Sequence, residues 1–448
     1  MKIKLIAPRM SLRPMDSEFK RLMTPSISLL VLAALTPSEH EVEIIDENLT
    51  PIRAYKNADL VGITCNVDNF ERAKEHSRKY QKKNIPVILG GIFPSSAPEI
   101  AELYGTSVCI GEAEPLWKDI LHDAQNGGLK KRYIWDGEYP AEMIPRPKWE
   151  ANDIKKYLYT NVITTGRGCP FSCEFCYNSC DYMNKNFRRR PVETIKNEIE
   201  KLGTKQVLFV DDNFIGNKTW LKEFLERISP LGLTWHAAVS ADIGKDLVLL
   251  DKMTETGCRS LYIGFESINA GSISSVKKSQ NKVHEYEITI REIHYRGIMI
   301  NASMVFGFDN DYPDVFENTL NWLVKNRIET MTSHILTPYP GTKLYKRLEK
   351  EGRIVDRNLR NYNTSRVVFK PRNMTPDDLL NGYLNIYRDF YSLKNILKRK
   401  PESKQQWIPY FLFNFAYRKF GKFVSKFAKN GNMSRIGELA RNLSYGIG

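Results

Sequence analysis

Short strand-like apolar segments alternate with helix-like segments along most of the chain, and this alternation limits the folds that the chain can adopt. In the first ~120 residues the strand-like segments lie at 3–7, 41–45, 60–65, 86–89 and 107–110. Helices are predicted between them, near 27–35, 70–82 and 97–103. Buried strands separated by helices predict βαβ units and a doubly wound, Rossmann-like parallel sheet. Ligands bind such sheets at the carboxyl ends of the strands.

A second series of the same kind follows, with strand-like segments at 159–164, 206–210, 234–239, 260–265, 299–306 and 332–336. Six strands, each followed by a helix, predict an open, partial (β/α)6 barrel of the TIM type, with functional residues at the carboxyl ends of the strands. Glycines and prolines interrupt any regular pattern between the two series. We therefore divide the chain into a doubly wound domain at 1–125, a linker at 126–157, a barrel at 158–340 and a helical C-terminal extension at 341–448.

Length and composition agree with this division. A chain of 448 residues predicts two or three domains. No apolar run approaches the ~18 residues that a membrane span needs, and the N-terminus begins with a strand-like segment and not with an apolar signal region. We therefore expect a cytoplasmic protein. Seven cysteines, an odd number, argue against a disulfide framework.

Four of the seven cysteines lie within twelve residues, directly after the first strand of the second series. Cys169, Cys173 and Cys176 have the spacing CxxxCxxC, which places three thiolates on one tight loop. Three thiolates can hold three corners of a [4Fe–4S] cube and leave one iron open to a substrate. The alternative is a zinc site with Cys180 as the fourth ligand.

The motif Cys169-Pro-Phe-Ser-Cys173-Glu-Phe-Cys176 resembles the signature of the radical S-adenosylmethionine (SAM) superfamily. The resemblance implies that the three cysteines ligate a [4Fe–4S] cluster, with SAM on the open iron. It implies SAM contacts at the carboxyl ends of the barrel strands and at the aromatic position of the motif; these residues are Phe175, Asp211, Asp212, Ser240 and Glu266. The alternatives are a local turn and helix cap for the two aspartates and a solvated strand end for Glu266.

A doubly wound domain before such a barrel resembles the cobalamin-binding subfamily of the superfamily. The C-terminal extension resembles that of hopanoid methylases and of tetraether-lipid ring synthases. The resemblance implies cobalamin at the carboxyl edge of the first sheet, in contact with Thr64, Gly90, Gly91, Gly111 and Glu112. Taken alone, these glycines also fit ordinary turns. Asp46 is followed by Glu47 and Asn48 and not by the histidine that coordinates cobalt in many relatives, so cobalamin would bind without a protein imidazole.

The resemblance implies reductive cleavage of SAM to a 5′-deoxyadenosyl radical, followed by cobalamin-dependent methylation of an unactivated carbon of a small-molecule or lipid-like substrate. It also implies an external reductant, flavodoxin or ferredoxin. Without cobalamin, the radical would drive carbon–carbon bond formation or rearrangement. The remaining alternatives are a transfer-RNA methylthiotransferase, which would need three cysteines where the N-terminal domain has only Cys65 and Cys109, and a non-enzymatic binding protein.

The basic charge of the chain is concentrated at its end. Residues 393–448 carry twelve lysines and arginines against two glutamates, which is +10 of the net +14. On a helix, apolar side chains would form one arc and basic side chains the other; the apolar arc is Ala416, Tyr417, Phe420, Phe423, Val424 and Phe427. Such a helix, with the aromatic residues from Trp407 onward and extending to 429, can lie on an anionic membrane. The alternatives are packing on the barrel and binding of RNA.

Overall fold

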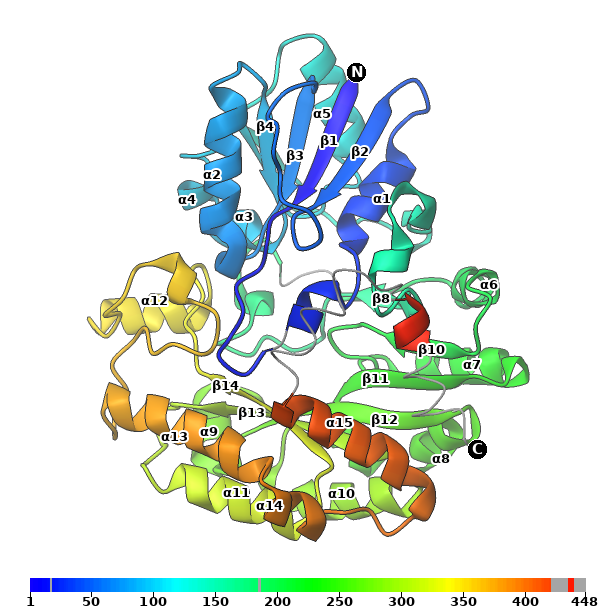
Figure 1. Ribbon diagram of the computed structural model, residues 1–448, viewed down its shortest axis with the longest axis vertical. Coiled ribbons are helices and arrows are strands. Elements are labelled where there is room, and N and C mark those ends of the chain that lie inside the picture. The colour runs from blue at the N-terminus through cyan, green and yellow to red at the C-terminus, as the bar shows by residue number, and fades with distance from the viewer. Residues whose placement is uncertain (17, 184–186, 420–433, 439–448) are drawn as a thin grey trace.

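The computed structural model describes residues 1–16, 18–183, 187–419 and 434–438. Its upper half is a sheet of six parallel strands in the spatial order β2-β1-β3-β4-β5-β6 (Figure 1). The strands are β1 (Lys2–Ala7), β2 (Glu41–Asp46), β3 (Leu60–Thr64), β4 (Val87–Gly90), β5 (Ser107–Ile110) and β6 (Arg132–Ile134). The order reverses direction between β1 and β3, and a crevice opens at such a switch point.

Helices cover both faces of this sheet, as the doubly wound prediction requires. They are α1 (Ile27–Leu35), α2 (Phe70–Gln81), α3 (Ile92–Ser96), α4 (Pro98–Ala101) and α5 (Trp117–Gln125). Successive side chains of a strand point to opposite faces: Leu5 packs in a core with Leu29 of α1 and Trp117 of α5, whereas Ile6 packs in a core with Phe70 and Phe93.

The stretch that we expected to be a linker, residues 126–157, contains β6, which pairs with β5 and extends the first sheet. Its three residues are too few to show a strand period in the sequence. The sheet pairing decides their structure, because the N–H of Val108 already donates to the carbonyl oxygen of Lys131 at 3.0 Å.

The lower half is a second sheet of six parallel strands, in the order β14-β13-β12-β11-β10-β7. The strands are β7 (Val162–Ile163), β10 (Gln206–Phe209), β11 (Thr234–Ser240), β12 (Cys258–Glu266), β13 (Met299–Phe306) and β14 (Thr330–Ile335). The strands lie side by side in the order in which they follow one another along the chain, from β7 to β14. The two edge strands, β7 and β14, do not pair with each other. This is the predicted partial barrel.

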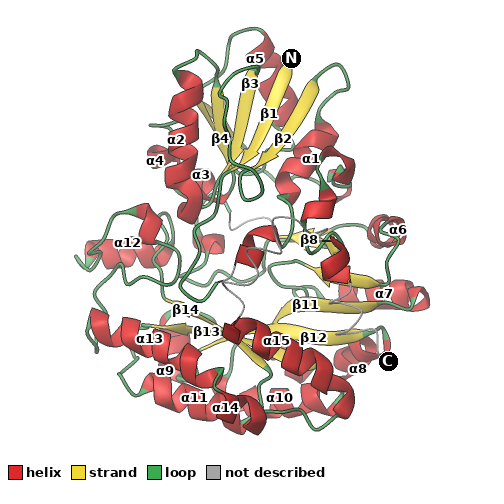
Figure 2. Ribbon diagram, in the orientation of Figure 1, coloured by secondary structure: helices red, strands yellow, loops and turns green. Residues whose placement is uncertain are grey.

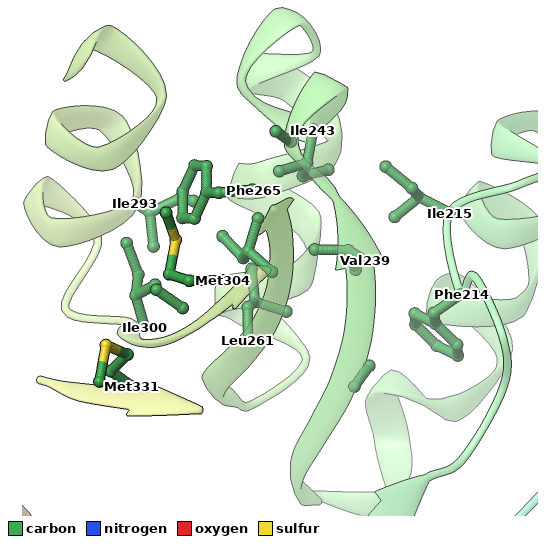
Figure 3. Close-up of a cluster of buried hydrophobic side chains, with 14 of the residues drawn as sticks. Phe214, Ile215, Val239, Ile243, Leu261, Phe265, Ile293, Ile300, Met304 and Met331 are labelled. Carbon is green, nitrogen blue, oxygen red and sulfur yellow. The ribbon is translucent and has the colours of Figure 1, made fainter. Parts of the chain in front are cut away.

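Helices pack on the outer face of the partial barrel (Figure 2). They are α6 (Val192–Lys201), α7 (Lys218–Ile228), α8 (Leu247–Glu255), α9 (Ala270–Ser275), α10 (Tyr286–Tyr295) and α11 (Val315–Lys325). Apolar side chains form the core between strands and helices: Leu261, Phe265 and Met304 lie there with Ile293 of α10 (Figure 3). The opposite face of the strands carries polar pairs instead, such as His236 Nδ1 with Ser260 Oγ at 2.7 Å.

The C-terminal extension is helical, as predicted, and it covers the open edge of β14. Its helices are α12 (Lys343–Lys350), α13 (Pro376–Phe390), α14 (Leu393–Lys398) and α15 (Trp407–Lys419). The backbone N–H groups of Met331 and Ser333 donate to the hydroxyl oxygens of Tyr391 and Tyr387, at 3.1 and 2.9 Å. The tyrosines thereby satisfy an edge that would otherwise present unpaired groups.

Among the described residues, no helix is long and apolar enough to cross a membrane.

Candidate active site

The three cysteines of the motif lie on one loop, which we call the cysteine loop (residues 168–176). It leaves strand β8 (Gly166–Arg167), and the chain returns to pair with β8 through β9 (Arg188–Arg189). Cys173 is buried and the other two are half-buried. Burial raises the pKa of all three thiols, that of Cys176 to about 12. Thiolates in this loop therefore need a bound cation to compensate for the loss of water.

The cysteine loop is flanked by buried amide oxygens that have no donor among the described residues. Gln280 donates its Nε2 to Cys173 Sγ at 3.8 Å, and its Oε1 is buried without a partner. Asn213 lies beside Cys169, where it opposes the rise in the pKa of that thiol, and it donates its Nδ2 to Ser240 Oγ at 3.2 Å; its Oδ1 is likewise unpartnered. Buried acceptors of this kind are nearly always satisfied, so the loop fits a ligand that brings ammonium or hydroxyl donors. Across the described residues, no three His, Cys, Asp or Glu side chains are grouped to hold a single metal ion.

The two arginines of β9 hold the β8–β9 ribbon between the two sheets. Arg188 pairs, at 2.5 Å, with Glu112, a residue that follows β5 in the first sheet. Arg189 pairs, at 3.2 Å, with Asp211, a residue that follows β10 in the barrel. Because neighbouring side chains of a strand point in opposite directions, one ribbon reaches both halves of the molecule.

A second ion pair joins the first sheet to the residue before the cysteine loop. Arg167 contacts both Glu112, at 3.4 Å, and Glu114. Glu112, predicted to contact cobalamin, thus binds Arg167 and Arg188 in this structure. It fixes the position of the cysteine loop relative to the first sheet.

Asp211 has a similar anchoring position at the barrel. Its carboxylate accepts from the backbone N–H groups of Thr165 and Gly166, at 3.0 and 2.9 Å, in addition to Arg189. Burial raises its pKa to about 6, and these donors oppose that shift. It therefore holds the start of the ribbon and does not cap a helix. Asp212, the next residue, faces the cavity described below.

The remaining predicted SAM residues lie around the same loop. Glu266 is buried and pairs with Lys278 at 2.5 Å, and the cysteines at 173 and 176 lie close enough to raise the pKa of that lysine. Glu266 has a φ of +64°, a strained value for a residue other than glycine, and such strain is concentrated at functional sites. Ser240 is buried and donates to Asp242. Phe175 packs at the edge of the barrel core, 6.3 Å from the ring of Phe308.

A cavity connects the carboxyl edge of the first sheet with the start of the cysteine loop. All five residues that we predicted for cobalamin line it, and so do Gly166, Arg167, Gly168, Asp211 and Asp212 from the barrel side. Helix α1 contributes Ser28, Leu29 and Leu32. The residues predicted for cobalamin therefore meet two of the residues predicted for SAM, Asp211 and Asp212, at one cavity. The other predicted SAM residues and the three cysteines are not among the residues that line it.

Two glycines at this edge are required by close backbone contacts. Gly91 has a φ of +102°, and a Cβ there would lie 2.9 Å from Thr64 Oγ1. Gly111 has a φ of +83°, and a Cβ there would lie 2.3 Å from the carbonyl oxygen of Trp135. Ser95 links the two turns, since its hydroxyl accepts from the N–H of Gly111 and donates to the carbonyl of Gly91, both at 2.9 Å.

None of the described residues that line the cavity is a histidine. Glu47, which directly follows Asp46, is a structural residue that accepts from Arg72 and contacts His76 Nε2 at 2.7 Å. His76 is fully buried on α2.

Sequence reasoning missed the residues that act through pairing. Arg167, Arg188, Arg189, Glu114 and Lys278 were not predicted, because a charged side chain shows its partner only in three dimensions. The available signals were the run of three arginines at 188–190 and the two carboxylates in Gly111-Glu112-Ala113-Glu114.

Comparison with known families agrees with this geometry. Residues 163–323 match the model of the radical SAM superfamily, and residues 342–410 match a domain of unknown function, DUF4070. The predicted resemblance is confirmed: the protein carries a radical SAM domain and is an enzyme. The cofactors of that domain are SAM and a [4Fe–4S] cluster.

Several of the similar curated proteins are named as methyltransferases, and others are named as cyclases. The chain is 28% identical over 406 residues to bacteriochlorophyllide d C-12(1)-methyltransferase of Chlorobaculum tepidum, covering 88% of each chain. It is 27% identical over 358 residues to hopanoid C-2 methylase of Rhodopseudomonas palustris, covering 76% of this chain and 67% of that one.

Two solved structures share the fold of the whole chain. The radical SAM methyltransferase TsrM from Kitasatospora setae, with cobalamin and a [4Fe–4S] cluster bound, superposes with a TM-score of 0.65 at 15% identity, covering 98% of this chain and 99% of that one. OxsB, a cobalamin-dependent SAM radical enzyme with aqua-cobalamin and SAM bound, gives a TM-score of 0.66 at 16% identity and covers 98% and 75%. The N-terminal sheet, the partial barrel and the helical extension therefore form a known architecture.

Proposed function

We propose that this protein is a cobalamin-dependent radical SAM C-methyltransferase. The cavity between the first sheet and the cysteine loop carries the proposal. The two curated relatives whose identities are given above are methyltransferases, and the two solved neighbours bind cobalamin, so both comparisons support the same activity.

Cysteines 169, 173 and 176 would ligate the cluster, and SAM would lie beside them. Phe175, Asp212 and Glu266 would contact SAM, together with the unpartnered amide oxygens of Asn213 and Gln280. Asp211 and Ser240 would act as positioning residues, the first through Thr165 and Gly166 and the second through Asn213.

The first sheet, which includes β6, would form the cobalamin-binding domain. Thr64, Gly90, Gly91 and Gly111 would lie against the corrin, and no histidine would bind cobalt. Glycines allow a large planar ligand to approach the backbone closely. Glu112 would border the site while it pairs with Arg167 and Arg188.

When bound, the cluster and SAM supply a substrate radical, and cobalamin supplies the methyl group. The chain itself would hold the two sites next to each other through the ribbon and would limit the access of water to the cysteine loop, where Cys173 is buried. Flavodoxin or ferredoxin would supply the electron. The substrate would be a small or lipid-like molecule, and the protein would work in the cytoplasm with a peripheral contact to a membrane.

Anaerobic gel filtration of the protein reconstituted with cobalamin, followed by cobalt analysis, tests the proposal. A Cβ at Gly90 meets only Cys109 Cβ at 3.7 Å, so the backbone accepts a side chain there, and Gly90→Val adds bulk to the cavity. We expect the wild type to retain cobalamin and Gly90→Val to bind it about tenfold more weakly or worse.

Gly128→Val is the matched control, because it adds the same side chain in open space away from the cavity. A wild type that retains no cobalamin, or equal binding by the two valine variants, would contradict the assignment of this cavity.

A further inference from the structure

Helix α15 has two faces of opposite character. Ile408, Leu412 and Phe415 recur at helical spacing, and their exposed fractions are 49, 39 and 40%. Tyr410 and Asn414 lie on the opposite face and are 1 and 0% exposed. An apolar stripe turned to solvent on a helix whose other face is buried calls for a partner.

The buried face fixes the orientation of the helix. Asn414 donates its Nδ2 to the carbonyl oxygen of Glu329 at 3.0 Å, at the start of β14, and its Oδ1 accepts from Arg399 at 3.1 Å. Tyr410 donates to the carbonyl oxygen of Ile396, in α14, at 2.5 Å. The barrel therefore holds α15 with its apolar stripe outward.

Helix α14 repeats the arrangement beside it. Ile396 is fully buried, whereas Leu393 and Leu397 are 51 and 63% exposed. Lys394 and Lys398 are exposed on the same short helix, and Lys404 precedes α15. Figure 1 shows both helices on the barrel half of the molecule, away from the first sheet.

We propose that this surface, formed by the exposed side chains of α14 and α15 and called here the docking face, binds the interface of an anionic membrane. Apolar side chains among lysines match a lipid interface, where the side chains enter the acyl boundary and the lysines meet the head groups. A second copy of this chain is disfavoured, because each copy carries +10 in residues 393–448 and the two would repel. A nucleic acid would use the lysines but not aliphatic side chains, and four of the five exposed apolar residues of this surface are aliphatic: Leu393, Leu397, Ile408 and Leu412.

The membrane contact proposed here lies earlier in the chain than the one that the sequence predicts. The arc that the sequence suggested lies mostly at 420–429, outside the described residues, whereas the docking face lies at 393–415. It does not depend on the reaction proposed above.

Co-sedimentation of the full chain with vesicles tests the docking face. The vesicles are phosphatidylcholine alone or mixed with phosphatidylglycerol, at moderate salt. We expect binding to the mixed vesicles only, and the triple variant Ile408→Ser, Leu412→Ser, Phe415→Ser should reduce it about tenfold or more. Circular dichroism confirms that the variant is folded.

The matched control replaces three apolar residues that are exposed elsewhere: Leu103→Ser, Val248→Ser and Tyr295→Ser, which are 72, 61 and 87% exposed. We expect it to bind vesicles like the wild type. The proposal is overturned if the wild type does not bind the mixed vesicles, if it binds neutral vesicles equally well, or if both triple variants bind alike.

Discussion

Replacing Glu112 by glutamine removes the carboxylate that joins the first sheet to the cysteine loop. Both oxygens of Glu112 accept from Arg188 at 2.5 Å, and the two side chains are 14 and 6% exposed. Arg167 keeps Glu114 in the variant, but the buried Arg188 loses its ion pair with the carboxylate of Glu112.

Removing one partner of a buried ion pair costs about 3–5 kcal/mol. Glu112 is partly exposed and the glutamine oxygen still accepts a hydrogen bond, so we expect a loss of about 2–3 kcal/mol. The loss should fall on the docking of the loop and not on the whole chain, because each sheet has a core of its own.

Hydrogen exchange measured by mass spectrometry over residues 163–183 reads this docking directly. A loss of 2–3 kcal/mol in the free energy of local opening speeds exchange by roughly 30- to 150-fold. Glu102→Gln is the control, since Glu102 pairs with Arg132 at 2.6 Å but the two side chains are 22 and 35% exposed, and exposed pairs contribute about 1 kcal/mol or less. Unchanged exchange in Glu112→Gln, or equal changes in both variants, would refute the role of Glu112 in holding the cysteine loop against the first sheet.

Two further predictions concern the cysteines and the pH dependence of stability. Replacing any of the three cysteines of the loop with alanine should abolish iron binding and SAM cleavage, measured by iron analysis and by release of 5′-deoxyadenosine, whereas Cys180→Ala should keep both; full activity in Cys173→Ala would count against the ligand set. Burial alone would lower the pKa of His294, but Glu329, 3.2 Å away, outweighs it and raises the pKa above 6.5. The stabilisation from this pair should be complete below pH 6.5 and should be lost as the pH rises through the higher folded-state pKa; urea unfolding at several pH values should show this loss in the wild type and not in His294→Gln.

The sequence alone predicts the secondary structure correctly where a local pattern of apolar residues determines it. The strands at 299–306 and 107–110 were predicted at the bounds that the structure gives, because their apolar runs leave no other arrangement in a parallel sheet. Thr64, Gly90 and Gly111 were placed at one edge for the same reason, since parallel strands end on the same side.

Pairing between distant residues could not be predicted in the same way. Glu112 and Asp211 were expected to contact ligands, and the structure shows that each also holds the ribbon through arginines far away in the sequence. The exposed stripe of α15 was hidden for a related reason: only the positions of Glu329 and Arg399 decide which side of this aromatic helix is buried.

Electron paramagnetic resonance of the anaerobically reconstituted, dithionite-reduced protein tests the central claim most directly, because it reports on the open iron of a three-cysteine cluster. We predict a reduced [4Fe–4S] signal whose shape changes when SAM is added to the wild type and which is lost in Cys173→Ala. A signal that is insensitive to SAM, or one that persists unchanged in Cys173→Ala, would contradict the account.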